Sequence, residues 1–392
     1  MDDIVNSTTE KKEVNLVHKK PFVLHIVTRA SWGGAQRYVY DVATDSKEYI
    51  QAVATESNGA LVDELRDQGV TVYPLSYARR SILPLYDVRT FFDIINLLRR
   101  VKPDIVHLHS SKMGVLGSVA ARILGFKKII FTAHGWPHNE NRTPFVIFIF
   151  KVFSVITVIC SHKVIAVSNS VLKTRPFTLF KNKFVRIYPA VMPPKYKERD
   201  KARDVLLRKT SLGKDNDFML IGIIGELTNN KGQATLLEAF KEIHSKYPHA
   251  RLICIGSGRD WPVLHTLTRN WDIDHLVGWI HDLNNAAIFM KAFDVVVTSS
   301  YTEAFGYVPL EAGLASVARI ATDVGGLPEL VENGVTGLLV PRNDPRALAH
   351  ALTTCIENSD LREKFGKQAH DALQKFTDLR KMRQEIYKEY ER

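Results

Sequence analysis

Apolar segments rich in β-branched residues alternate with helical patterns along nearly the whole chain, and this alternation constrains the fold most strongly. Six segments lie in the first half, at residues 22–28, 49–55, 70–75, 105–109, 128–133 and 163–168. Six more follow, at residues 218–225, 251–256, 275–277, 293–298, 319–322 and 337–340. Helical patterns such as 36–44 and 88–101 separate them. Such alternation predicts an α/β protein with two parallel, doubly wound sheets in tandem.

The length of 392 residues also exceeds what one hydrophobic core usually supports. Residues 1–20 are polar and charged without the apolar core of a secretory signal, so we expect a flexible tail. The expected domains are residues 21–191 and 218–375. Residues 192–217, with adjacent prolines and mixed charges, suit a linker or a short exposed helix, and residues 376–392 a C-terminal helix. The ligand is then expected in the cleft between the domains.

The charge of the chain is one-sided. Residues 1–190 carry 26 Lys and Arg against 15 Asp and Glu, whereas residues 191–392 carry 27 of each. This favours an anionic surface, such as a membrane leaflet, as a partner of the first domain, with solubility alone as the simpler explanation. We expect no nucleic-acid partner, because no reading motif or interleaved aromatic pattern occurs. The three cysteines are far apart, which argues against a disulfide framework or a zinc site and for a reducing compartment.

Residues 145–160 form an apolar run interrupted by Lys151, Ser154 and Thr157. The run is shorter than the roughly 20 residues of a spanning helix, and its lysine lies near the middle. A buried helix and a helix lying in the membrane interface both remain open.

Two carboxylates, Glu303 and Glu311, bracket a glycine turn that directly follows the apolar segment 293–298. Pro309 suits the first turn of a helix, where its missing N–H would have no partner. Glu303 is therefore expected in a loop and Glu311 early in the helix, both at the carboxyl ends of parallel strands, where open sheets bind ligands. Ionised carboxylates accept several hydrogen bonds from hydroxyls, such as those of sugar and ribose rings.

The sequence GELTNNKG at residues 225–232 follows the apolar segment 219–224 and precedes a helix. Lys231 is thus expected at a helix N-terminus, where free N–H groups and the helix dipole favour a phosphate. Residues 31–34 make a similar glycine turn after the first segment. They lack the G-x-G-x-x-G fingerprint of nicotinamide cofactors, and no P-loop sequence occurs.

Three histidines of the first domain, His107, His109 and His134, lie at or just beyond strand ends. His134 is expected to face the cleft, while His107 and His109 also suit plain hydrogen bonding in the domain core. A metal site would require carboxylate or cysteine partners at matching strand ends, and none is evident, so we expect no metal. Residues 325–329 read as a glycine loop near the two glutamates, either a tight turn alone or a ligand contact.

Taken together, these pieces resemble the family 4 retaining glycosyltransferases of the GT-B fold. The matching segments occur in family order: GGAQR at 33–37, HSSK at 109–112, HG at 134–135, GELTNNKG at 225–232, residues 303–311, GGLPEL at 325–330 and NGVTG at 333–337. They cover roughly residues 22–350. The resemblance implies two Rossmann-like domains facing a central cleft, with the acceptor bound by the first and a nucleotide sugar by the second.

By this resemblance Glu311 would hold the ribose hydroxyls and Glu303 the donor sugar. Lys231 would clamp the diphosphate, Gly34 would close over it, and His134 would lie by the reacting sugar. The catalytic candidates are Glu303, Lys231 and His134. The donor side would comprise Gly34, Glu226, Lys231, Gly278, Glu303, Phe305, Gly306 and Glu311, and the acceptor side Gly33, His109, Lys112 and His134.

The implied reaction is retaining transfer of a hexose from a nucleotide sugar, expected to be UDP-linked, without a metal or other cofactor. The implied acceptor is a lipid-linked or growing glycan of cell-surface polysaccharide synthesis, at the cytoplasmic face of the membrane. Two alternatives remain: a sugar-nucleotide epimerase of similar fold, and a non-catalytic partner subunit that binds nucleotide or membrane.

Three departures from the family pattern stand out. Glu226 replaces the usual arginine of a Gly-Arg-Leu segment, which removes one of two phosphate cations. Residues 316–319 read SVAR where Gly-x-Pro-Val is usual, and residues 188–191 read YPAV where an Asn-Gly turn is common.

Overall fold

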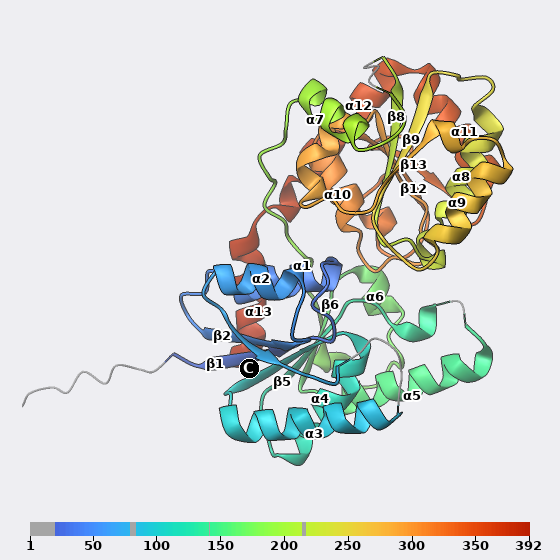
Figure 1. The fold of residues 1–392 in the computed structure, drawn as a ribbon. Coiled ribbons are helices and arrows are strands. Elements are labelled where there is room, and N and C mark those ends of the chain that lie inside the picture. Colours follow the sequence, from blue (N-terminus) through green and yellow to red (C-terminus); the bar gives the residue numbers. More distant parts are fainter. Residues whose placement is uncertain (1–19, 79–83, 141, 214–216) are drawn as a thin grey trace, which may run out of the picture.

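Two α/β domains make up the computed structural model, which describes residues 20–78, 84–140, 142–213 and 217–392 (Figure 1). Except for Lys20, the expected N-terminal tail lies outside the described residues. The chain crosses between the domains twice, because its last helix returns to the first domain (Figure 1).

The first domain is built on a sheet of seven parallel strands in the order β3-β2-β1-β4-β5-β6-β7. The strands are β1 Phe22–Ile26, β2 Ile50–Thr55, β3 Thr71–Pro74, β4 Ile105–His109, β5 Ile129–Ala133, β6 Lys163–Ala166 and β7 Phe184–Arg186. Strands β4 and β5 are buried throughout, because helices cover both faces of the sheet.

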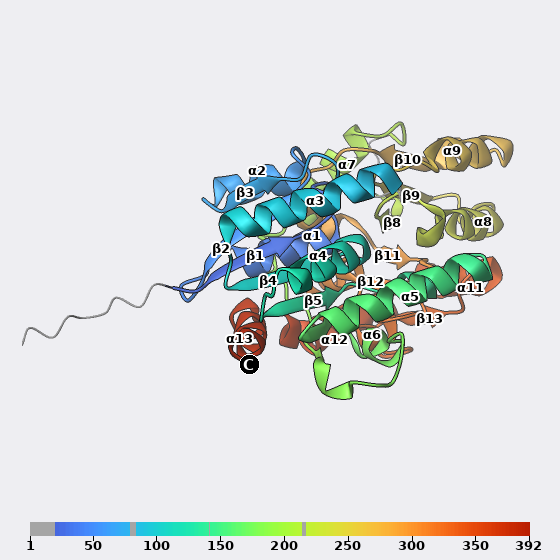
Figure 2. The ribbon, with the colours of Figure 1, turned by 90° about the horizontal axis from the view of Figure 1, so that it is seen from below.

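Helices flank this sheet on both sides. They are α1 Gly34–Ala43, α2 Ala60–Asp67, α3 Pro84–Val101, α4 Ser111–Ile123, α5 Pro144–Cys160 and α6 Asn169–Lys173. Helices α3, α4 and α5 lie side by side on the lower side in Figure 1 and in front in Figure 2. Helices α1 and α2 pack on the opposite face around Val39, Leu61 and Leu65.

The second domain repeats this plan with six parallel strands in the order β10-β9-β8-β11-β12-β13. The strands are β8 Met219–Ile224, β9 Ala250–Ile255, β10 Val277–Ile280, β11 Val295–Thr298, β12 Ala318–Thr322 and β13 Leu338–Val340. The helices are α7 Arg199–Arg208, α8 Gln233–Ile243, α9 Trp261–Asn270, α10 Tyr307–Leu314, α11 Pro345–Glu357 and α12 Ser359–Leu373, and the chain ends with α13 Leu379–Glu391, which packs on the first domain. Helices α8, α9 and α11 cover one face of the sheet, and α7 and α10 cover the other.

In both sheets the strand order reverses beside the first strand, between β1 and β4 and between β8 and β11. Loops at the carboxyl ends of these strands separate there and leave a crevice for a ligand. The predicted fold of two doubly wound Rossmann-like domains is confirmed. Two strand details differ: β7 has no counterpart among the predicted segments, and β10 lies at Val277–Ile280 rather than at residues 275–277.

The junction between the domains is closed by contacts from distant parts of the chain. Helix α13 packs on α1 and the first sheet through Met382, Ile386 and Tyr390. Glu329 of the second domain accepts hydrogen bonds from the backbone N–H groups of Asn169 and Ser170 at the start of α6, at 3.0 and 2.9 Å. Within residues 192–217, α7 packs its apolar side on the second domain.

Helix α5 contains the apolar run singled out above. It lies on the domain surface with Phe145 and Phe148 exposed, while Ser154, Thr157 and Val158 are buried against the domain. No helix among the described residues is both long enough and apolar enough to cross a bilayer.

Candidate functional site

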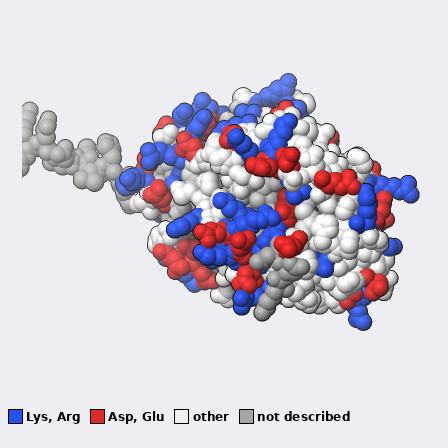
Figure 3. All heavy atoms as spheres, turned by 90° about the horizontal axis from the view of Figure 1, so that it is seen from above, with Lys and Arg blue, Asp and Glu red and all other residues white. Residues whose placement is uncertain are grey.

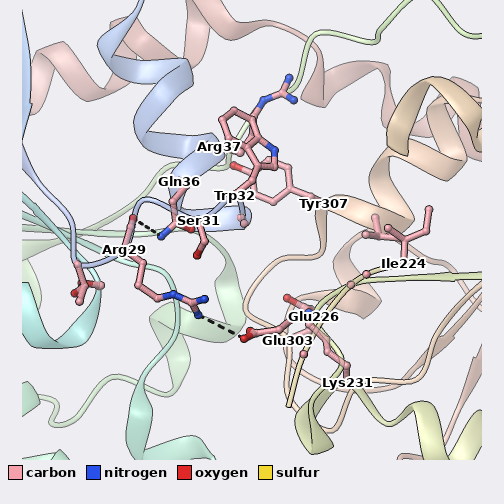
Figure 4. Close-up of a pocket in the computed structure, with 18 of the residues that line it drawn as sticks. Arg29, Ser31, Trp32, Gln36, Arg37, Ile224, Glu226, Lys231, Glu303 and Tyr307 are labelled. Carbon is pink, nitrogen blue, oxygen red and sulfur yellow. Dashed lines mark hydrogen bonds and ion pairs between the residues drawn. The ribbon is translucent and has the colours of Figure 1, made fainter. Parts of the chain in front are cut away.

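A cavity of about 1780 Å³ separates the carboxyl ends of the two sheets. It is lined from the first domain by the glycine turn before α1 and by α4, and from the second by the loops after β8 and β11. A smaller neighbouring cavity of about 960 Å³ shares Glu303 with it and is lined by His134. Figure 4 shows side chains of both domains converging on the main cavity.

Lys231 and Glu303 form the centre of the second-domain wall. The Lys231 Nζ atom lies 2.6 Å from Glu303 Oε2, and both side chains are partly exposed to the cavity. Their loops are joined because Asn230 Nδ2 donates to the Thr302 carbonyl at 3.1 Å and Tyr301 N–H donates to the Asn230 carbonyl at 2.7 Å. The ammonium group is therefore held beside the N-terminus of α8, where an anion is favoured.

Two glycines allow these loops to approach each other closely. Gly232 has φ +65°, and a Cβ there would lie 2.0 Å from the Ser299 carbonyl oxygen. Gly325 has φ +57°, and a Cβ there would lie 1.7 Å from the Glu303 carbonyl oxygen. Only glycine suits such positions without strain. The loop at residues 325–329 thus supports the backbone of Glu303.

Glu311 lies in the second turn of α10, as the sequence predicts, and lines the same cavity. Burial raises the pKa of its carboxyl group to about 7, partly opposed by the positive charge of Arg37. Arg37 belongs to α1 of the first domain and pairs with Asp41 at 2.9 Å. Burial leaves this carboxylate poorly hydrated as long as no ligand is bound. It therefore suits hydrogen bonds donated by ligand hydroxyl groups.

The first-domain wall presents the N-terminus of α1. Gly33 and Gly34 line the cavity, and a Cβ at Gly34 would lie 3.2 Å from the ring of Tyr307 on the other domain. Lys112 at the start of α4 also lines the cavity and pairs with Asp87 at 2.6 Å. Trp32 is partly exposed in the cavity wall beside Tyr40.

His134 ends a chain of buried hydrogen bonds. Its Nε2 lies 3.2 Å from His109 Nδ1, His109 Nε2 lies 3.0 Å from His25 Nδ1, and His25 Nε2 lies 2.8 Å from Gln51 Oε1. Desolvation lowers the pKa of His134 to about 3 and that of His25 to about 4, and it holds the pKa of His109 well below its usual range. The imidazoles are therefore neutral at physiological pH.

The ring nitrogens of His25, His107 and His109 lie close enough together to suggest a metal site. Each nitrogen, however, already has a protein partner. His107 contacts the Tyr390 hydroxyl at 2.6 Å and the Thr132 hydroxyl at 2.7 Å, and the other two bond as described above. These hydrogen bonds account for the cluster without an ion.

Three predicted site residues lie elsewhere than expected. Gly278, in β10, lies against Thr210 and Leu212 rather than in the cavity wall, where His281 takes part. Phe305 is buried among the aromatic rings of the domain junction, with its ring centre 5.6 Å from that of Phe376. His109 is buried behind His134 and does not line either cavity.

The remaining predicted residues line one of the two cavities: Gly33, Gly34, Lys112, His134, Glu226, Lys231, Glu303, Gly306 and Glu311. Sequence reasoning missed Arg29, Trp32 and Arg37, which also line the main cavity. Their position next to the glycine turn of residues 33–34 is the sequence feature that could have indicated that they line the cavity.

Arg319, which departs from the family pattern, has a structural role in the core next to the cavity wall. It is fully buried and donates to the carbonyl oxygens of Pro309, Leu330 and Thr336 at 3.1, 3.1 and 2.8 Å. Burial lowers the pKa of its guanidinium to about 9. Arg319 therefore ties the start of α10 to the segment that follows the glycine loop.

Both domains match known families. Residues 32–191 match the family described as Glycosyltransferase Family 4, and residues 207–372 match Glycosyl transferases group 1. The chain belongs to the family 4 glycosyltransferases. It is 25% identical over 360 residues to the Escherichia coli UDP-Gal:alpha-D-GlcNAc-diphosphoundecaprenol alpha-1,3-galactosyltransferase, covering 88% of this chain and 90% of that protein. It is 27% identical to the capsular polysaccharide biosynthesis glycosyltransferase CapM of Staphylococcus aureus over 334 residues, covering 82% and 84%.

Solved glycosyltransferases share the fold. The structure of Anabaena HepE in complex with UDP and glucose has a TM-score of 0.79 at 20% identity and covers 93% of this chain and 98% of its own. WaaG, a glycosyltransferase involved in lipopolysaccharide biosynthesis, has a TM-score of 0.73 at 15% identity, with coverage of 93% and 98%. The prediction of a GT-B glycosyltransferase is confirmed, and neither the epimerase nor the non-catalytic alternative is favoured.

Proposed function

We propose that this glycosyltransferase moves a hexose from a UDP-linked donor to a lipid-linked acceptor of cell-surface polysaccharide synthesis, with retention of configuration. The carrying observation is the interdomain cavity, in which Lys231, Glu303 and Glu311 face the N-termini of α1 and α4. The donor class is supported by the UDP-Gal in the name of the E. coli relative and the UDP bound by HepE. The acceptor class is supported by the diphosphoundecaprenol of the same relative.

In the proposed reaction the bond between sugar C1 and the β-phosphate oxygen breaks as the acceptor oxygen bonds to C1 on the same face. Negative charge develops on the leaving diphosphate in the transition state. Lys231 and the N-terminus of α8 stabilise this charge more strongly than they stabilise the ground state. The acceptor proton passes to the leaving phosphate oxygen. Glu311 accepts the ribose hydroxyls and His134 contacts the sugar as a neutral imidazole. We propose no metal or other cofactor.

The first-domain part of the cavity suits an acceptor with a lipid chain. Between α4 and α5 its lining is mostly apolar, with Leu116, Phe131, Trp136, Phe150 and Phe153. Burial of acyl or prenyl methylene groups there contributes about 0.8 kcal/mol for each methylene. The acceptor phosphates would remain near Lys112, at the polar end of this lining.

The same domain offers a surface for an anionic leaflet. Exposed apolar side chains gather on α3, α4 and α5 and the loop before β7: Leu85, Val88, Phe92, Ile123, Phe145, Phe148, Val152, Ile159, Leu179 and Phe180. Lys151, Lys181 and Lys183 lie among them in the sequence. The outer face of the second domain instead mixes both charge signs (Figure 3). We propose a peripheral location at the cytoplasmic leaflet, which is anionic.

Sedimentation with anionic vesicles tests this location. Replacing Phe145 and Phe148, which are 73% and 63% exposed, by serine is expected to reduce pelleting severalfold. Val263→Ser is the matched control, because Val263 is 63% exposed on α9 of the second domain. Equal pelleting of all three proteins would count against a membrane face on α5.

Calorimetric titration with UDP, GDP and ADP tests the donor site. UDP is expected to bind most tightly, and Glu311→Ala is expected to weaken it by tenfold or more, because two ribose hydroxyls lose their acceptor. Preference for GDP or ADP would change the proposed donor. Absence of binding to all three would overturn the site assignment.

A further inference from the structure

Glu226 leaves the proposed donor site short of a cation, because the family usually has an arginine at this position. The structure offers a replacement from the opposite domain. Arg29 follows β1 in the first domain, and its Nη1 atom lies 3.4 Å from Glu226 Oε1. Figure 4 shows the Arg29 side chain reaching across the cavity to the loop that carries Glu226 and Lys231.

We propose that Arg29 is a binding residue for the donor diphosphate and supplies, from the first domain, the positive charge that Glu226 has removed from the second. This inference rests on the proposed donor site. In it, Glu226 holds the guanidinium over the phosphate position before the donor arrives, and the diphosphate then takes over as the anionic partner.

Arg29 differs from the other cations of the cavity wall in how it is paired. Among the described residues, five Lys or Arg side chains line this cavity, and each has a carboxylate partner. The distances are 3.4 Å for Arg29–Glu226, 2.9 Å for Arg37–Asp41, and 2.6 Å for Lys112–Asp87, Arg142–Glu140 and Lys231–Glu303. The Arg29 pair has the longest contact and is the only one of these five that joins the two domains. Its partner is therefore the most readily exchanged for a ligand phosphate.

Two hydrogen bonds hold the backbone at Arg29, whereas its side chain is held by the longer contact with Glu226. Gln36 Nε2 donates to the Arg29 carbonyl at 3.1 Å, and the Ala30 N–H donates to Glu56 at 3.1 Å. The side chains of Arg29 and Glu226 remain 34% and 40% exposed. A positioned backbone with a partly exposed guanidinium group is suited to binding a phosphate, and the planar fork of that group allows two hydrogen bonds to phosphate oxygens.

The charged groups nearest the proposed phosphate position are paired with one another. Lys231 and Glu303 neutralise each other, as do Arg29 and Glu226, so these four groups contribute no net charge to a multiply charged diphosphate. Moving the Arg29 guanidinium from Glu226 to the phosphates changes a loose, solvent-screened pair into a charge-assisted contact at the leaving group. Because Arg29 belongs to the first domain, this contact also draws the two domains together over the donor.

Calorimetric titration of the full chain with UDP and with uridine tests the inference. Arg29→Ala is expected to weaken UDP binding by about tenfold to a hundredfold and to leave uridine binding within about threefold, because only UDP carries phosphates. Glu226→Ala is expected to raise the affinity for UDP relative to uridine, since it removes a competing carboxylate. Arg259→Ala is the matched control, because Arg259 also pairs with a carboxylate at 3.4 Å, on Asp260, and does not line the cavity.

The outcomes separate this inference from the proposed function. Suppose that the wild-type protein binds UDP and that Lys231→Ala weakens this binding, whereas Arg29→Ala leaves it unchanged. The role proposed for Arg29 is then wrong, while the proposed donor site stands. If Arg29→Ala and Glu226→Ala weaken the binding of UDP and of uridine equally, the Arg29–Glu226 pair holds the two domains together and does not bind phosphate. If wild-type protein binds no nucleoside diphosphate, the proposed function falls and this inference falls with it.

Discussion

Replacing Glu311 by glutamine is expected to stabilise the ligand-free protein at alkaline pH. Burial raises the pKa of the Glu311 carboxyl group to about 7, against an ordinary value of 4.5; Arg37 lowers it and Asp41 raises it. Between pH 4.5 and about pH 7, the Glu311 carboxyl group is ionised in the unfolded chain but keeps its proton in the folded protein. The folded state therefore loses stability as pH rises from about 4.5 to about 7, and the loss stays constant above that range.

The size of this effect follows from the same two values. The difference between 7 and 4.5 is about 2.5, and at 1.36 kcal/mol for each pKa unit it corresponds to about 3 kcal/mol. Glu311 is partly exposed to the cavity, so solvent screens part of this cost. We expect Glu311→Gln, which cannot ionise, to gain about 1–2 kcal/mol over wild type at pH 8.

Thermal unfolding at pH 8 and pH 5 measures the gain. One kcal/mol shifts the midpoint of a domain of this size by about 2–4 °C, so the variant is expected to unfold several degrees higher at pH 8. The advantage should shrink to a small remainder at pH 5. Glu242→Gln, on the exposed side of α8, serves as the control. The reasoning is refuted if Glu311→Gln shows the same difference from wild type at both pH values, or is less stable at pH 8.

Three further predictions concern other parts of the account. Tyr390→Phe removes the buried hydroxyl 2.6 Å from His107 and is expected to cost about 1–3 kcal/mol in denaturant unfolding; an unchanged midpoint would contradict the role of α13 in the first domain. Arg319→Leu removes the buried guanidinium that donates to three carbonyl oxygens and is expected to cost about 3 kcal/mol or more, with weaker UDP binding because the first turn of α10 is released. Lys231→Ala is expected to lower the transfer rate at least about a hundredfold without changing the unfolding midpoint; a rate within threefold of wild type would exclude Lys231 from catalysis.

Local patterns were enough to predict the sheets and one wall of the site. Apolar runs and glycine turns lie within about ten residues of each other, and parallel strands bring their carboxyl ends to one edge. The loops of Lys231 and Glu303 are each predicted in this way at the carboxyl end of a strand of the second domain, and the structure brings the two side chains to 2.6 Å. The helix of Glu311 was predicted in the same way, from Pro309 and the preceding glycine.

Contacts between distant segments could not be predicted in this way. The pairing of Arg29 with Glu226 depends on how the two domains face each other, and no periodicity encodes that orientation. The same holds for Phe305, which looks like a site residue by its motif but packs on Phe376 at the junction. His25 was overlooked because a histidine in the middle of an apolar strand resembles a core residue until its neighbours on β4 are known.

Transfer from a panel of UDP-hexoses to a diphosphoundecaprenol-linked sugar, with the anomeric configuration of the product read by NMR, tests the central claim most directly. We predict transfer from one UDP-hexose with the α configuration of the donor kept in the product, and loss of transfer in Lys231→Ala. A product of inverted configuration, or transfer only from a donor with another nucleotide, would contradict the account.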